Sequence, residues 1–427
     1  MNRVKLNQFD ETLYRKTLDN GLEVFLLPRN EMEKTYGIFS TKYGSIDQSF
    51  SPIGEDEIVT VPDGIAHFLE HKLFEKEDGD VFQIFSKQGA SANAYTSFTR
   101  TSYLFSSTKY VNENVNTLLN FVQNPYFSDE TVEKEKGIIA QEIKMYDDQP
   151  DWRLFFGVIR SMFAEHPVRI DIAGTVESIT NITKENLYTC YNTFYHPSNM
   201  VLFVTGPIQP EEMMALIEGN QAKKSFDPPE DIKRSYPDEP ESVAEKEVII
   251  NMPVSTSKCL VGVKQKAAKL EKNEILYTKL VTDMVFDYFF SKSGEYYEQL
   301  DQKGLIEDQF DYEIYVESTF GFCAIGGDSR KPKELYEELK QMLLTISQSS
   351  IREEDFERMK KKKLGDLIRS LNSLESVANQ FIQYHQIDIN YFDVFDLLDK
   401  MTVEDFQKFL SDWITEDRIS VCYVLPE

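Results

Sequence analysis

Histidine, cysteine and tryptophan are scarce in this sequence, with 5, 4 and 2 copies among 427 residues. The cysteines, Cys190, Cys259, Cys323 and Cys422, lie far apart and form no Cys-x-x-Cys pair. This spacing argues against a cysteine-bound metal and against the disulfide framework of a small secreted domain. We therefore expect buried, free thiols in a reducing compartment, and we predict a cytoplasmic protein.

Positive charge and long apolar runs are also lacking. The 72 acidic residues outnumber the 46 basic ones, and the formal net charge is −26. Such a field repels nucleic acid and attracts basic peptides, so we expect no nucleic-acid partner. No stretch is long and apolar enough for a membrane span, and the first ten residues lack the apolar core of a signal peptide.

Two of the five histidines fall in one short stretch, residues 64–75, which contains the sequence His-Phe-Leu-Glu-His. On a helix, residues four apart share a face, so His67 and His71 can bind one metal ion. Glu70 then lies beside the metal as a general base for a water molecule. The His-x-x-Glu-His spacing is typical of inverzincin metallopeptidases. The alternative is an ordinary surface helix with two unrelated histidines.

A catalytic metal with two histidine ligands needs a third protein ligand and one open position. A long helix is predicted to begin at Ser128, and it carries Glu135 and Glu142 on one face with apolar residues. Carboxylates on a buried face are costly unless they are paired or bind metal, although a solvated face is the alternative. We predict Glu142 as the third ligand and Glu135 as a group that orients a histidine. His166 and His196, each followed by proline, are competing ligands. The apolar residues of that face are Ile138, Ile139, Met145 and Tyr146.

The predicted order of elements occurs twice along the chain. We predict a first domain at residues 1–218, a proline-containing charged linker at 219–245 and a second, similar domain at 246–427. Each domain is predicted to contain, in this order, strands, a helix, a strand pair, further helices and a closing strand. The second domain has no histidine where the first has the metal helix, and its single histidine, His385, is expected to be packed or to cap a helix. Only the first domain is therefore expected to contain a catalytic metal site.

These residues resemble the pitrilysin family of inverzincin metallopeptidases, which includes insulin-degrading enzyme and mitochondrial processing peptidase. The resemblance implies an α+β fold of two duplicated halves, each a mostly antiparallel sheet backed by helices, which form a half-shell of a peptidase chamber. It covers the first 206 residues through six motifs, at residues 67–74, 91–97, 135–142, 166–167, 174–179 and 195–200.

The resemblance also implies a zinc-dependent endopeptidase that cleaves peptides or unfolded segments. One zinc ion per chain would be bound by His67, His71 and Glu142, with Glu70 as the base and Glu135 behind a ligand. Histidines and one carboxylate suit zinc, with manganese and cobalt as alternatives. A peptide substrate would add as a strand to a sheet edge. That edge is expected at Ala92, Asn93, Ala94 and Tyr95.

One segment departs from the family pattern. Active members carry an arginine and a tyrosine that hold the substrate and its oxyanion, but Asp301 and Glu307 stand at the corresponding positions here. A carboxylate cannot stabilise an oxyanion. We therefore expect a heterodimer with a paralogous subunit that supplies the arginine and tyrosine, as in two-chain bacterial members. The alternatives are a self-sufficient homodimer that uses Tyr312 or Tyr315, and a non-catalytic or peptide-binding subunit.

Overall fold

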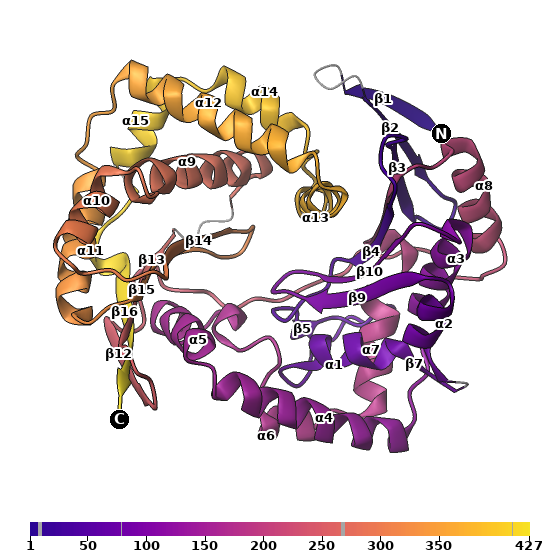
Figure 1. The fold of residues 1–427 in the computed structure, drawn as a ribbon. Helices are drawn as coiled ribbons and strands as arrows, with labels where there is room; N and C mark the ends of the chain where they lie inside the picture. The colour runs from indigo at the N-terminus through magenta and orange to yellow at the C-terminus, as the bar shows by residue number, and fades with distance from the viewer. Residues whose placement is uncertain (7–10, 78, 266–269, 412) are drawn as a thin grey trace. The chain divides into compact units, whose positions relative to one another are not determined.

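The computed structural model describes the whole chain except residues 7–10, 78, 266–269 and 412. Contacts divide the described residues into two compact units. Each unit contains a mostly antiparallel sheet backed by helices, which confirms the predicted α+β fold (Figure 1). Unit 1 consists of Met1–Ile143, Ile170–Ser235 and Ser370–Gln386. Unit 2 consists of Lys144–Arg169, Tyr236–Arg369 and Ile387–Glu427.

The sheet of unit 1 has seven strands in the order β1-β2-β3-β11-β4-β10-β9. All neighbours are antiparallel except β3 and β11, which run parallel. A turn at residues 18–22, which contains the predicted Asn-Gly signal, joins β2 to β3, and Gly21 there has a φ of +87°. The strands are β1 (Asn2–Leu6), β2 (Glu11–Thr17), β3 (Glu23–Pro28), β4 (Thr35–Thr41), β9 (Ala90–Thr96), β10 (Thr101–Ser107) and β11 (Met200–Gly206).

Helices cover both faces of this sheet (Figure 1). Tyr103 of β10 contacts Phe74 of α1 (Ile65–Phe74), with the ring centroids 5.9 Å apart. Phe203 of β11 points to the opposite face and contacts Phe381 of α13 (Leu374–His385), with the centroids 4.6 Å apart. The helix α13 therefore covers the face that α1 does not. The other helices of unit 1 are α2 (Val81–Lys87), α3 (Val111–Val122), α4 (Asp129–Asp147, whose last turn belongs to unit 2), α6 (Val176–Thr180), α7 (Lys184–Phe194) and α8 (Pro210–Gln221).

The sheet of unit 2 has five strands in the order β12-β16-β13-β15-β14. Its single parallel pair is β12 and β16, and its strand connectivity is that of β3-β11-β4-β10-β9 in unit 1. This shared topology supports the predicted duplication. The strands are β12 (Glu247–Met252), β13 (Lys258–Lys264), β14 (Phe310–Val316), β15 (Gly321–Asp328) and β16 (Ile419–Pro426). The helices are α5 (Pro150–Met162), α9 (Lys272–Phe290), α10 (Glu295–Gln302), α11 (Pro332–Ile346), α12 (Glu353–Ser370), α14 (Asp393–Lys400) and α15 (Val403–Ser411).

The compact units are not contiguous in sequence, because each sheet is covered by a helix from the other half of the chain. The helix α5 packs on β13 and β16 of unit 2, where a Cβ on Gly157 would lie 2.5 Å from Cys422 Sγ. The helix α13 packs on β4 and β11 of unit 1. The predicted domains, 1–218 and 246–427, thus differ from the compact units by the exchange of residues 144–169, with α5, and 370–386, with α13. The predicted linker, 219–245, is divided between the units after Ser235. The amphipathic pattern of such a helix predicts a buried face without specifying the sheet that buries it.

Two expectations from composition bear on the described residues. The four cysteines are buried and free, as predicted. Burial raises the pKa of each thiol, for example to about 12 for Cys190, so these groups have little thiolate character. None of the described helices is both long and apolar enough to cross a membrane.

Candidate active site

The helix α1 begins at a glycine that no other residue could replace without strain. Gly64 at the helix N-cap has a φ of +84°, and a Cβ there would lie 2.3 Å from the carbonyl oxygen of Ala173. L-residues with a side chain rarely adopt this φ, so the start of the helix is fixed. From this start His67 and Glu70 are buried and His71 is half-buried.

The three predicted ligands converge. One ligand atom from each of His67, His71 and Glu142 lies within 4.8 Å of the other two, and no other group of this kind occurs among the described residues. His67 Nε2 lies 3.7 Å from Glu142 Oε1, and His71 Nε2 lies 3.6 Å from Glu142 Oε2. Zinc bonds of about 2.1 Å in a tetrahedron would separate two ligand atoms by about 3.4 Å. The observed distances and the His₂Glu donor set therefore fit a zinc ion.

The second nitrogen of each imidazole has a different environment. His71 Nδ1 lies 3.1 Å from Glu135 Oε1, and Glu135 is itself buried. This contact fixes the ring so that Nε2 faces the other ligands, as is usual for a metal-binding histidine. His67 Nδ1 is buried and has no hydrogen-bond partner in the described part of the chain. Among the described residues, no hydrogen bond to Nδ1 therefore orients the ring of His67.

The electrostatics of the two histidines differ because their neighbours differ. Burial lowers the pKa of His67 to about 3, and the nearby His71 adds to this shift. His67 is consequently neutral at physiological pH, which is the state that binds a metal. Burial also disfavours the charged form of His71, but the hydrogen bond to Glu135 and the carboxylates of Glu70 and Glu142 outweigh it and raise its pKa.

Glu70 lies on α1 between the two histidines and does not belong to the ligand cluster. Its side chain is buried, with 7% of the residue exposed, and its Oε2 accepts a hydrogen bond of 2.7 Å from the hydroxyl of Thr96. Burial raises the pKa of Glu70, while the bond from Thr96 opposes that shift. A carboxylate with a raised pKa beside a metal site is suited to proton transfer.

Strand β9 is an edge of the sheet, as the sequence predicts, since in the described structure it pairs only with β10. The N–H of Ser97 donates to the carbonyl of Arg100 at 2.8 Å, so Ser97 bonds to the neighbouring strand. Along an antiparallel strand every second residue bonds to the neighbour, and the residues between them face the other way. The N–H and C=O groups of Ala92, Ala94 and Thr96 therefore point to the open side of β9. Asn93 Oδ1 accepts a hydrogen bond of 2.9 Å from the N–H of Ala94. The side chain of Asn93 thus covers one donor of this open edge.

Sequence reasoning missed two partners of these residues. The sequence motif at residues 91–97 includes Thr96 without indicating a role for it, and no motif includes Asn379. The hydroxyl of Tyr95 donates to Asn379 Oδ1 at 2.7 Å, and Asn379 Nδ2 donates to the hydroxyl of Tyr36 at 3.2 Å. Asn379 lies on α13, so the edge strand is held by a helix nearly 300 residues further along the chain. No local pattern in the sequence could have indicated this contact.

The competing histidines do not join the ligand cluster. His196 Nε2 lies 2.8 Å from the carbonyl oxygen of Asp227, and its Nδ1 accepts from the N–H of Ser198. His166 belongs to unit 2, and its Nδ1 accepts from the N–H of Val168. Burial lowers the pKa of His166 to about 4. Both histidines thus stabilise the turns that their following prolines predict.

The predicted apolar face of α4 is partly wrong. Ile138 and Met145 are 46% and 52% exposed, whereas Glu135 and Ile139 are buried. The buried stripe is narrower than the spacing predicted, because only part of the helix circumference faces the rest of unit 1. His385, at the end of α13, is packed as predicted, and its Nε2 lies 2.7 Å from Glu23 Oε2.

Asp301 and Glu307, which the resemblance predicts at the positions of an arginine and a tyrosine, lie in unit 2. Asp301 is exposed on α10, and Glu307 forms an exposed ion pair with Arg330 at 3.1 Å. The alternative oxyanion groups, Tyr312 and Tyr315, lie on β14. The hydroxyl of Tyr315 donates to Glu313 at 3.1 Å. The pKa of Tyr312 is raised, mainly by burial and additionally by nearby aspartates.

Two family profiles match the chain. The profile described as insulinase, peptidase family M16, matches residues 61–176. This range contains all five residues that the sequence predicts for the metal site. The profile described as the peptidase M16 inactive domain matches residues 181–363. This second range contains most of the strands of unit 2.

Individual relatives agree with these profiles. The chain is 53% identical over 424 residues to YmfH of Bacillus subtilis (strain 168), named an uncharacterized zinc protease, with 99% of each chain covered. It is 29% identical over 173 residues to a protein of Arabidopsis thaliana named mitochondrial-processing peptidase subunit beta, which covers 39% of this chain and 32% of that one. The crystal structure of an M16-like peptidase from Alicyclobacillus acidocaldarius matches with a TM-score of 0.93 and 41% identity, over 98% of this chain and 99% of that one.

Proposed function

Because this chain belongs to the insulinase family of peptidases, family M16, we propose that it is a zinc-dependent endopeptidase of peptides and unfolded segments. Homologues with the name zinc protease support both the peptidase activity and the metal. The observation that carries the proposal is the convergence of His67, His71 and Glu142, with Glu70 between the two histidines on the same helix. A chain with a purely structural role has no need of a buried carboxylate beside a metal.

The proposed mechanism assigns proton transfer to Glu70. Zinc held by His67, His71 and Glu142 would polarise the scissile carbonyl group and lower the pKa of a water molecule. Glu70 accepts the proton of the attacking water and later delivers it to the leaving amine. Thr96 holds the Glu70 carboxylate in place through its 2.7 Å hydrogen bond. Glu135 holds the ring of His71.

The proposed substrate site is the open edge of β9. A peptide that pairs there is recognised through its main chain, which explains a preference for extended or unfolded segments over one sequence. The edge ends at Thr96, and Thr96 contacts Glu70, so a strand added to Ala92–Thr96 leads to the catalytic groups. Asn93 must release the N–H of Ala94 before a substrate carbonyl can accept it.

We propose that the functional form is a heterodimer. Asp301 and Glu307 offer carboxylates where the family places an arginine and a tyrosine, so a paralogous subunit would supply these groups. The name of the Arabidopsis relative, a subunit, is consistent with this view. The homodimer that uses Tyr312 or Tyr315 is the second form to test. The half-shell chamber remains a prediction.

The test of the mechanism is Glu70→Gln. We expect the variant to retain about one zinc per chain and to lose peptide hydrolysis by about 10² to 10⁴-fold, the usual contribution of a general base. Zinc is measured by elemental analysis, and hydrolysis with a quenched fluorescent peptide. Glu133→Gln, at an exposed position on α4, is the matched control. Undiminished hydrolysis by the Glu70 variant would refute the mechanism.

The test of the partner compares the purified chain alone with the chain co-expressed with a paralogue. Zinc together with activity only in the mixture supports the heterodimer. Activity of the chain alone at full rate supports the homodimer. Absence of zinc and of activity in both preparations would favour the non-catalytic subunit.

A further inference from the structure

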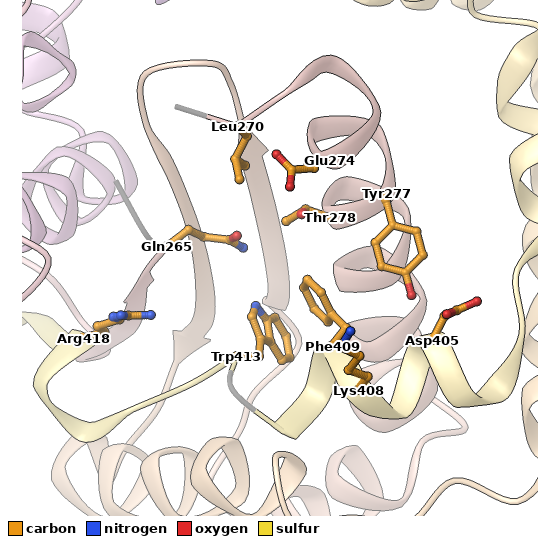
Figure 2. A pocket seen from close by; sticks show the side chains of 10 residues that line it. All are labelled: Gln265, Leu270, Glu274, Tyr277, Thr278, Asp405, Lys408, Phe409, Trp413 and Arg418. Atoms are coloured by element: carbon orange, nitrogen blue, oxygen red, sulfur yellow. The ribbon is translucent and has the colours of Figure 1, made fainter. Parts of the chain in front are cut away.

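The lysine that directly follows His71 on α1 is completely buried. The side chain of Lys72 has 0% of its surface exposed. A lysine normally carries its ammonium group into water, and it is almost never fully buried unless that group is paired. Lys408 on α15 shows the usual arrangement, since it is exposed at the wall of a cavity of unit 2 (Figure 2). The burial of Lys72 therefore depends on the groups that pair with its ammonium.

Two groups accept hydrogen bonds from that ammonium. Lys72 Nζ donates to Glu75 Oε2 and, at 3.3 Å, to the main-chain carbonyl of Thr131. Glu75 directly follows α1, keeps 29% of its side chain exposed, and lies 3.7 Å from Nζ of Lys134 on α4. Thr131 belongs to the first turn of α4. Lys72 thus joins the end of α1 to the beginning of α4, and all these residues belong to unit 1.

This junction lies one helical turn from the proposed metal site. In an α-helix the carbonyl of Thr131 faces the N–H of Glu135, four residues later. Glu135 Oε1 in turn lies 3.1 Å from His71 Nδ1, and His71 is the sequence neighbour of Lys72. The two helices are therefore joined at two successive points, His71 with Glu135 and Lys72 with Thr131. These contacts fix how α4 lies along α1, and so where Glu142, about two turns further along α4, meets the histidines.

We propose that Lys72 is a positioning residue of the metal site, whose buried ion pair sets the placement of α4 against α1 and thereby of Glu142 against the two histidines. The inference rests on the proposed zinc peptidase function. A buried ion pair need not stabilise a fold, because lost hydration offsets the attraction and an apolar side chain of similar volume often serves equally well. An ion pair requires a defined geometry, whereas apolar burial is non-directional. Lys72 is therefore expected to contribute more to metal binding than to stability.

Replacement of Lys72 by methionine tests this role. Methionine has a flexible, unbranched side chain without the charge, and the half-exposed Glu75 stays hydrated, so the variant is expected to fold. Its dissociation constant for zinc, measured by chelator competition, should rise about 10 to 100-fold, the usual effect of removing a group that supports metal ligands. Cobalt(II) in place of zinc should give an altered visible absorption spectrum, because its bands depend on the ligand geometry.

The matched control is Lys76→Met. Lys76 lies four residues after Lys72, and its Nζ donates to the carbonyls of Phe121 at 2.8 Å and Asn124 at 2.6 Å, at the end of α3 and not on α4. Lys76→Met removes the same group from the same part of the chain, and we expect unchanged zinc affinity and an unchanged cobalt spectrum. Glu75→Gln is a milder variant, which removes the charge of the Lys72 partner and should also weaken zinc binding.

The outcomes separate this inference from the peptidase proposal. Unchanged zinc affinity and cobalt spectrum in Lys72→Met, with folding checked by circular dichroism, would overturn the inference and leave the peptidase proposal intact. Equal losses in Lys72→Met and Lys76→Met would also overturn it, because they assign Lys72 a general structural role. If Lys72→Met does not fold, unchanged zinc binding by Glu75→Gln overturns the inference. Absence of zinc from the unmodified chain would overturn the proposed function and this inference together.

Discussion

Replacement of Thr96 by valine tests the coupling between the edge strand and Glu70. Valine conserves the shape of threonine and removes only the hydroxyl that donates to Glu70 Oε2 at 2.7 Å. A hydrogen bond to a charged group stabilises that group by about 1.5 to 3 kcal/mol. Thr96 is half-buried, so we use the lower end of this range. Since 1.36 kcal/mol corresponds to one pH unit, the pKa of Glu70 in the variant should rise by about one unit.

The direction of the effect on catalysis follows from the role of Glu70 as a base. Burial already raises the pKa of Glu70, and loss of the Thr96 bond removes a group that opposes this shift. The carboxylate form is then lost at a higher pH, so the acid limb of the pH dependence of kcat/KM should move upward by about one unit. At a pH well above that limb the variant should retain most of its activity.

The assay is the pH profile of hydrolysis of a fluorogenic peptide by whichever assembly is active. Thr108→Val is the control, since Thr108 is exposed just after β10 and the substitution makes the same chemical change. An acid limb that coincides with that of the unmodified protein would refute the proposed interaction between Thr96 and Glu70. A uniform decrease at every pH would instead assign Thr96 to substrate binding.

Three further predictions concern the metal and the edge strand. Glu135→Gln removes the charged partner of His71, so a chelator competition assay should show about 10 to 100-fold weaker zinc binding, with exposed Glu133→Gln unchanged. The pKa of His71 is raised, so below that pKa zinc must displace a proton from His71, and zinc affinity should fall as the pH is lowered. Calorimetry in buffers of different ionisation enthalpy should detect the released proton. Absence of proton release at mildly acidic pH would contradict the role of His71 as a zinc ligand. Asn379→Leu removes the partner of the Tyr95 hydroxyl, so KM should rise more than kcat falls, whereas an unchanged KM would separate α13 from substrate binding.

The sequence alone determined the features that depend on local spacing. His67 and His71 share a helix face because they are four residues apart, and Glu135 and Glu142 share one because seven residues complete nearly two turns. Alternation and turn residues likewise predicted β9 and β10 as a strand pair. These patterns repeat over a few residues, so they are visible without knowledge of the fold.

Which distant segments of the chain come into contact depends on the tertiary structure. The hydrogen bond between Thr96 and Glu70, the contact of Asn379 with Tyr95, and the exclusion of His166 and His196 from the ligand cluster depend on how helices pack on sheets. The exchange of α5 and α13 between the two sheets is of the same kind. An amphipathic helix stabilises whichever apolar surface it covers, and that stabilisation is non-directional. The choice between two similar sheets is therefore made by packing over the whole chain and not by any local pattern.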